Sequence, residues 1–109
     1  MTARLAARFW VDAYLARLRL ADLSAFVTAH GDDTAGAVIV KSATLDGRAR
    51  AFQRVMTLEG RRWHVLAEGA EAEIDAAIAR ARDFDRDLWV IEVEDRDGRH
   101  LLEEEGLAE

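Results

Sequence analysis

The spacing of hydrophobic and polar residues along this 109-residue chain predicts a helix over residues 3–22. Apolar residues recur there at intervals of three and four, which is typical of a helix with one buried face. We expect Trp10 and Tyr14 to pack in the core or on the flank of that face, and not to offer a stacking platform to a ligand. Because the helix is apolar around most of its circumference, only a narrow polar strip should face water. The expected buried stripe consists of Leu5, Phe9, Ala13, Ala16 and Leu20, widened by Val11, Leu15 and Leu18.

The remaining pattern predicts a first strand, a three-stranded antiparallel meander, a second helix and a last strand. Alanine richness, with acids first and bases last, favours the second helix over residues 70–82. Residues 95–98 predict a hairpin turn that leads into a short edge strand at 99–102. The predicted fold is α+β: a two-layer sandwich in which a mostly antiparallel sheet of about five strands carries both helices on one face. The strands are expected at 23–30, 37–40, 49–58, 63–67 and 88–94.

Length and composition predict a single domain over residues 1–109 and exclude several kinds of chemistry. The chain has no cysteine and no proline. The lack of cysteine rules out a disulfide scaffold, a thiolate metal site and a cysteine nucleophile. No apolar run approaches the ~20 residues that span a bilayer, and no signal peptide is recognisable, so we expect a cytoplasmic protein.

The net charge of −6 is concentrated at one end of the chain. Residues 1–82 hold 12 basic and 10 acidic side chains, whereas residues 83–109 hold 3 basic and 11 acidic ones. The last residues, from about 103, are expected to form a solvated acidic tail. Residues 41–62 carry six bases and two acids, so a positive strand face is expected there.

The sequence contains no recognisable catalytic, metal or cofactor motif. Its three histidines lie far apart, and serine occurs only at positions 24 and 42. The glycines form no nucleotide-binding fingerprint. We therefore expect no catalytic residue, no metal and no cofactor, and favour a non-enzymatic protein.

The candidate binding residues gather on the two strands of the basic segment. Arg50, Phe52 and Arg54 alternate onto one strand face, so two guanidiniums flank an aromatic ring. Three roles are open for these arginines: they pair with Glu92 and Glu94 across the sheet, they bind an acidic protein partner, or they bind nucleic acid or another anionic ligand. The full candidate set is Lys41, Arg48, Arg50, Gln53 and Arg54.

Three segments of the chain together resemble a small bacterial family of unknown function, DUF1491. The resemblance covers nearly the whole chain and implies a stand-alone bacterial protein with no assigned activity, cofactor or catalytic residue. The segments are residues 7–15 (ARFWVDAYL), 40–54 (VKSATLDGRARAFQR) and 87–96 (DLWVIEVEDR).

These observations favour a non-enzymatic α+β module that binds a protein partner or a second copy of itself. Self-association would use a sheet edge or the apolar flank of the first helix. The alternative is a protein that binds nucleic acid or an anionic ligand through its arginines, with Glu92 and Glu94 as metal ligands for phosphoryl chemistry.

Overall fold

In the computed structural model, which describes residues 6–108, the chain forms two α-helices and five strands. The α+β class is therefore confirmed, and the predicted residues 3–5 of the first helix lie outside the described part. No helix within residues 6–108 is long and apolar enough to cross a membrane. In chain order the elements are α1 (Ala7–Leu20), β1 (Ser24–Ala29), β2 (Val38–Ala43), β3 (Arg48–Thr57), β4 (Gly60–Ala70), α2 (Glu71–Phe84) and β5 (Trp89–Glu94).

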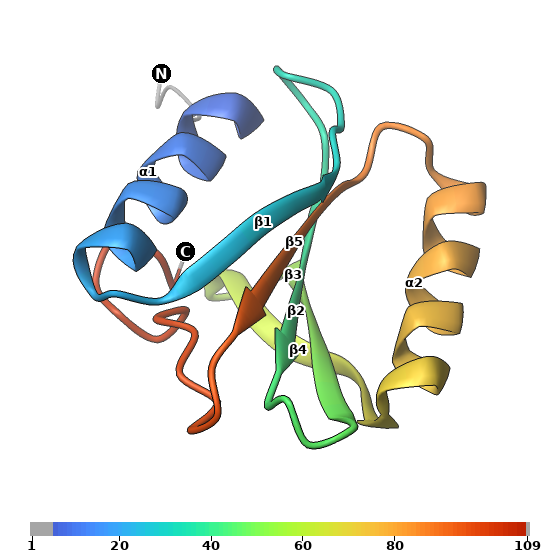
Figure 1. Ribbon diagram of the computed structural model, residues 1–109. Coiled ribbons are helices and arrows are strands. Elements are labelled where there is room, and N and C mark those ends of the chain that lie inside the picture. The colour runs from blue at the N-terminus through green and yellow to red at the C-terminus, as the bar shows by residue number, and fades with distance from the viewer. Residues whose placement is uncertain (1–5, 109) are drawn as a thin grey trace.

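The strands form one sheet in the order β1-β5-β2-β3-β4. β2, β3 and β4 are neighbours in antiparallel pairs, which confirms the predicted meander. β5 inserts between β1 and β2, antiparallel to the first and parallel to the second. α2 provides the long connection that a parallel pair needs, because it carries the chain from β4 at one edge back to β5 (Figure 1).

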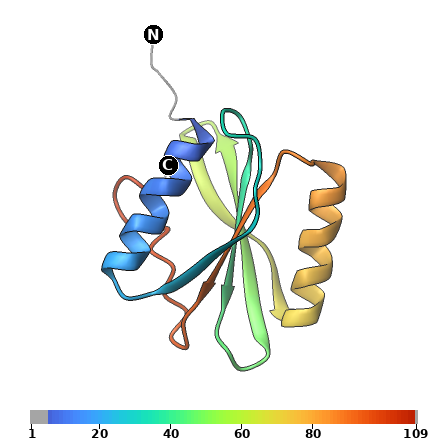
Figure 2. The ribbon, with the colours of Figure 1, turned by 45° about the horizontal axis from the view of Figure 1, so that its top comes forward.

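The two helices cover opposite faces of the sheet, so the prediction that both pack on one face is wrong (Figures 1 and 2). Val38 and Val40 of β2 belong to the core beneath α1. Ile39, between them, packs in the core beneath α2 with Ile74 and Ile78. A continuous apolar strand sends side chains to both faces, and both faces must then be covered. The structure therefore has three layers, with the sheet between the two helices, where two layers were predicted.

α1 faces the sheet with a different side from the one predicted. Val11 and Leu18, which were expected to widen the stripe, are buried, but the centre of the predicted stripe lies outward, with Phe9 68% and Leu20 86% exposed. Both sets satisfy spacings of three and four, so periodicity alone does not separate them. The larger apolar area of the tryptophan and tyrosine decides which set is buried. The buried set is Ala7, Trp10, Val11, Tyr14 and Leu18.

The C-terminal segment, residues 99–108, packs beside α1 on the same face of the sheet. It contains no strand, which corrects the predicted edge strand at 99–102. Leu102 and Leu107 are buried, and the Leu107 carbonyl accepts a hydrogen bond of 2.8 Å from Trp63 Nε1. The Tyr14 hydroxyl donates to the His100 carbonyl at 2.7 Å. The segment is therefore docked through its two leucines, whereas residues 103–106 between them are exposed to solvent.

Candidate functional site

The five predicted site residues lie on both faces of the sheet. In the β2–β3 register Lys41 pairs with Ala51, and Ser42 pairs with Arg50. Since successive residues of a strand point to opposite faces, Lys41 and Arg50 cannot share a site. Gln53 pairs with Ile39, whose side chain packs beneath α2, so Gln53 lies on the Lys41 side.

Lys41 is a buried cation that joins α2 to the sheet. Its Nζ lies 2.8 Å from Glu71, 2.7 Å from Asp75 and 3.2 Å from Glu92. Burial acts to lower the pKa of Lys41, but the hydrogen bonds to these three carboxylates outweigh it and raise that pKa. Lys41 is therefore charged, and its ammonium group is bound by carboxylates of its own chain instead of an external anion.

The predicted pairing of the arginines with Glu92 and Glu94 is absent. Glu92 binds Lys41, and Glu94 pairs in register with Ala43, which packs beneath α2. Both carboxylates thus lie on the face opposite Arg50. Within residues 6–108, no group of three or more histidine, aspartate or glutamate side chains is arranged to hold a metal ion.

Arg54 is held among the aromatic residues beneath α1. Its guanidinium carbon lies 5.2 Å from the centre of the Trp10 ring and 5.7 Å from that of Trp63. The two tryptophan rings are themselves 5.3 Å apart. Such cation–π contacts stabilise the packing of the β3–β4 hairpin against α1. This arginine has a structural role.

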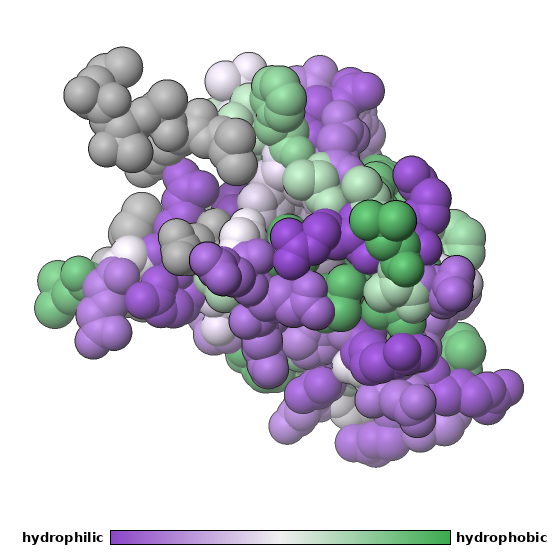
Figure 3. Space-filling model, turned by 90° about the vertical axis from the view of Figure 1, so that its left-hand side faces the viewer, coloured by the Kyte–Doolittle hydropathy of each residue, from purple (hydrophilic) through white to green (hydrophobic). Residues whose placement is uncertain are grey.

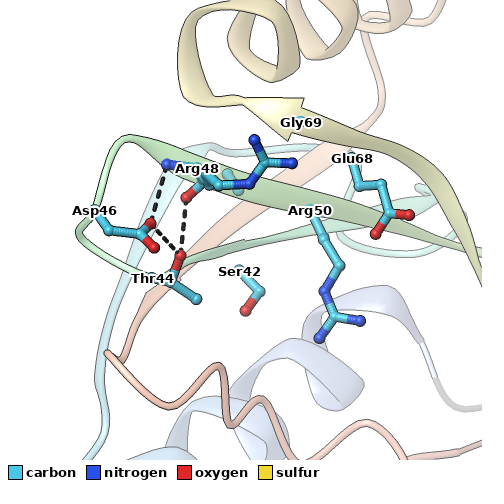
Figure 4. Close-up of a pocket in the computed structure, with 8 residues that line it drawn as sticks. Ser42, Thr44, Asp46, Arg48, Arg50, Glu68 and Gly69 are labelled. Atoms are coloured by element: carbon cyan, nitrogen blue, oxygen red, sulfur yellow. Dashed lines mark hydrogen bonds between the residues drawn. The ribbon is translucent and has the colours of Figure 1, made fainter.

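Arg50 lines two adjoining hollows, which we call together the Arg50 cleft. One hollow, of about 210 Å³, lies over the ends of β2, β3 and β4 and includes Ser42, Arg48 and Glu68 (Figure 4). The other, of about 380 Å³, lies against the C-terminal segment and includes Gly98 and His100. Arg50 is the side chain that both hollows share.

The Arg50 guanidinium rests on an aromatic ring and has no carboxylate partner among the described residues. Its central carbon lies 5.0 Å from the centre of the Phe52 ring. Glu68 is its register partner on β4 and extends to the same side of the sheet (Figure 4), yet no ion pair joins the two side chains. The ring leaves the edge of the guanidinium available to an acceptor.

Several acids around the cleft are engaged elsewhere. Asp46 accepts hydrogen bonds from the Thr44 hydroxyl (2.6 Å) and the Arg48 backbone N–H (3.1 Å), and these bonds lower its pKa (Figure 4). Asp95 forms a two-point contact with Arg99, at 3.1 and 3.0 Å, which lowers the pKa of Asp95 in the same way. These local partners explain why neither carboxylate reaches Arg50.

His100 forms the half-buried wall of the cleft next to Arg50. Its ring centre lies 4.6 Å from that of Phe52, and its Nδ1 accepts the Leu102 backbone N–H at 3.1 Å. Burial, and after it the nearby Arg50 charge, lower the pKa of His100. A neutral ring bonded at Nδ1 carries its proton on Nε2, which makes it a donor. Nothing in the sequence singles out His100, because a histidine that follows a turn is ordinarily exposed.

Comparison with known proteins identifies the family of the chain. Residues 5–103 match the model of the protein of unknown function family DUF1491. The chain belongs to this family. The resemblance noted in the three sequence segments is thereby confirmed.

Solved structures of DUF1491 proteins share this fold. The crystal structure of a DUF1491 family protein from Caulobacter crescentus CB15 is 40% identical, with a TM-score of 0.84 over 92% of this chain and 96% of that one. An NMR structure of a DUF1491 family protein from the same organism is 39% identical, with a TM-score of 0.82 over 94% and 96%. The solution structure of a protein from A. tumefaciens is 31% identical, with a TM-score of 0.72 over 84% and 86%. No curated protein matches the chain.

Proposed function

We propose that this DUF1491 protein is a non-enzymatic binding module whose protein partner places a single carboxylate against Arg50. The observation that carries the proposal is the position of the Arg50 guanidinium, in a cleft, on an aromatic ring and without a carboxylate among the described residues. A planar guanidinium binds a carboxylate through two parallel hydrogen bonds, which adds direction to the charge attraction.

The surroundings of Arg50 strengthen such a contact. The Phe52 ring and the half-buried His100 ring exclude water from one side of the guanidinium, and lower local polarity increases the attraction between opposite charges. The Ser42 hydroxyl and His100 Nε2 lie in the same cleft and can donate to the same acceptor. Arg50 is thus placed beside neutral donors that can bind the same carboxylate.

The acidic residues of the cleft favour a protein carboxylate over a polyanion. Glu68, Asp97 and Glu103 line the same hollows as Arg50. They repel a chain of phosphates, and the net charge of −6 opposes nucleic acid binding at longer range. A partner that presents one carboxylate between basic or polar residues places its carboxylate against Arg50 and its basic groups against the acidic residues of the cleft.

The proposal is tested by comparing ligand classes in one NMR titration of amide chemical shifts. The probes are the blocked peptide acetyl-Lys-Glu-Lys-amide, its Gln analogue, inorganic phosphate and a short single-stranded RNA. We expect the Glu peptide to shift residues 42, 50 and 98–101, and the Gln analogue to leave them in place. Tighter RNA binding at the same residues would overturn the proposal in favour of a nucleic acid ligand.

A further inference from the structure

The outer face of α1 carries an unpartnered apolar stripe. It consists of Phe9, Ala13, Ala16 and Leu20, which we call the outer stripe. Phe9 is 68% and Leu20 86% exposed, and the two alanines are exposed between them. Figure 3 looks onto this side of the molecule and shows green and pale green side chains among the purple ones. Among residues 6–108, no other helix or strand lies over this side of α1 (Figure 1).

The outer stripe is symmetric along the helix. Positions 9 and 20 are equally far from the midpoint between residues 14 and 15, and so are positions 13 and 16. With a rise of ~1.5 Å per residue, Phe9 and Leu20 lie about 16 Å apart along the axis. If an identical helix lies antiparallel across the midpoint, Phe9 faces Leu20 of the other copy, and the alanines meet at the centre.

We propose that the outer stripe binds the outer stripe of a second copy of this chain, antiparallel, around a two-fold axis at that midpoint. The small alanines at the centre let two helix backbones approach closely. Phe9 and Leu20 then close the two ends of the contact and lose most of their water-exposed surface. This inference is independent of the Arg50 cleft.

The charges beside the outer stripe fit this arrangement. Asp12 and Arg19 lie on the same side of it. Asp12 pairs with Arg8 of its own chain at 3.5 Å, and Arg8 also reaches Asp33 at 3.7 Å, whereas Arg19 has no carboxylate partner among residues 6–108. The antiparallel two-fold brings Asp12 of one copy to within one helical turn of Arg19 of the other, so Arg19 gains a carboxylate there. Arg17, on the opposite side, is already neutralised by Glu104 of its own chain at 3.0 Å. The arrangement therefore adds attraction on one side and brings no uncompensated arginines together on the other.

The first test measures association by sedimentation equilibrium from about 5 to 500 µM, a range that brackets the weak affinity of small interfaces. The wild-type chain is expected to dimerise, and Phe9→Glu to weaken the dimer at least tenfold. The matched control is Phe84→Glu, because Phe84 is a 97% exposed aromatic residue on α2. A monomer throughout this range, or equal weakening by Phe84→Glu, would overturn the proposal.

The second test determines the orientation of the two helices. Because the chain has no cysteine, single cysteine variants give unambiguous cross-links. A mixture of Phe9→Cys and Leu20→Cys chains is expected to form the mixed disulfide, whereas each variant alone stays unlinked. Disulfides within either variant alone would indicate a parallel pair and contradict the proposed symmetry.

The contact between Asp12 and Arg19 has its own test, by charge exchange. Asp12→Arg should weaken the dimer, and Asp12→Arg combined with Arg19→Asp should restore it. A double variant that associates no better than Asp12→Arg alone would contradict the contact.

Discussion

The central guanidinium carbon of Arg50 lies over the Phe52 ring, 5.0 Å from the ring centre, and the centre of the His100 ring lies 4.6 Å from that of Phe52. Phe52 is therefore the platform on which a permanent cation and a titratable ring are held side by side. This relationship couples the charge of the cleft to pH.

The pKa of His100 is expected to depend on Arg50. Burial lowers that pKa, and the positive charge of Arg50 lowers it further. Arg50→Met removes the second cause, so the pKa of His100 should rise toward the ordinary histidine value of about 6.5. An NMR titration of the His100 ring protons measures this directly, with Arg96→Met as a control. An unchanged His100 pKa in Arg50→Met would contradict the coupling.

The same shift makes stability depend on pH. Because folding lowers the pKa of His100, the unfolded chain binds more protons as the pH falls below about 6.5. The stabilisation that comes from neutral His100 is therefore fully present above about pH 6.5, and it is lost as the pH falls toward the pKa of His100 in the folded protein. Urea unfolding at pH 7.5 and 5.5 should show a larger loss for the wild type than for His100→Gln. Equal losses would show that His100 does not contribute.

Leu107 should contribute to global stability even though it lies only two residues before the last residue of the sequence. It is 1% exposed, and its carbonyl accepts the Trp63 Nε1 hydrogen. Leu107→Ala is expected to lower the free energy of unfolding by about 2–3 kcal/mol, as for other buried leucines. Leu58→Ala is the control, since Leu58 is fully exposed at the β3–β4 turn. Urea unfolding followed by tryptophan fluorescence measures both; equal stability of the two variants would mean that the segment is not docked.

Replacing Lys41 should destabilise the protein at neutral pH. Lys41→Met leaves three carboxylates close together without their cation, and breaking a buried pair costs about 3–5 kcal/mol. Since Glu71 and Asp75 reach solvent, we expect about 2 kcal/mol. Folding raises the pKa of Lys41, so the stabilisation that charged Lys41 gives to the folded protein persists up to about pH 10.5 and is lost at higher pH. Arg86→Met, which breaks an exposed pair, should change stability by less than about 0.5 kcal/mol in the same urea unfolding measurement. A loss for Lys41→Met no larger than that of Arg86→Met would contradict the structural role of Lys41.

The elements of the fold could be predicted from local patterns, but their arrangement could not. Alternation and turn residues were sufficient for the β2–β3–β4 meander. The insertion of β5 between β1 and β2 depends on long-range packing that no local pattern reports. A side chain at Gly31 or Gly36 would collide with the Asp87 carbonyl, so the loop between β1 and β2 packs closely against the residues before β5, a contact that no local pattern reports.

The candidate site was partly predictable for a similar reason. Alternation correctly placed Arg50, Phe52 and Arg54 together, because it depends only on the strand itself. Whether Lys41 shares their face depends on the register between β2 and β3, which the intervening turn sets. His100 reaches the cleft only because Leu102 and Leu107 dock the C-terminal segment.

The most direct test of the proposed function is the affinity of acetyl-Lys-Glu-Lys-amide for three forms of the protein, measured from amide shifts at neutral pH. The wild type and Arg86→Met should bind the peptide equally, because Arg86 lies outside the cleft. Arg50→Met should weaken binding at least tenfold, with its fold confirmed by unchanged shifts elsewhere. Equal affinity in Arg50→Met and the wild type, or no binding to the wild type at millimolar peptide, would contradict the account.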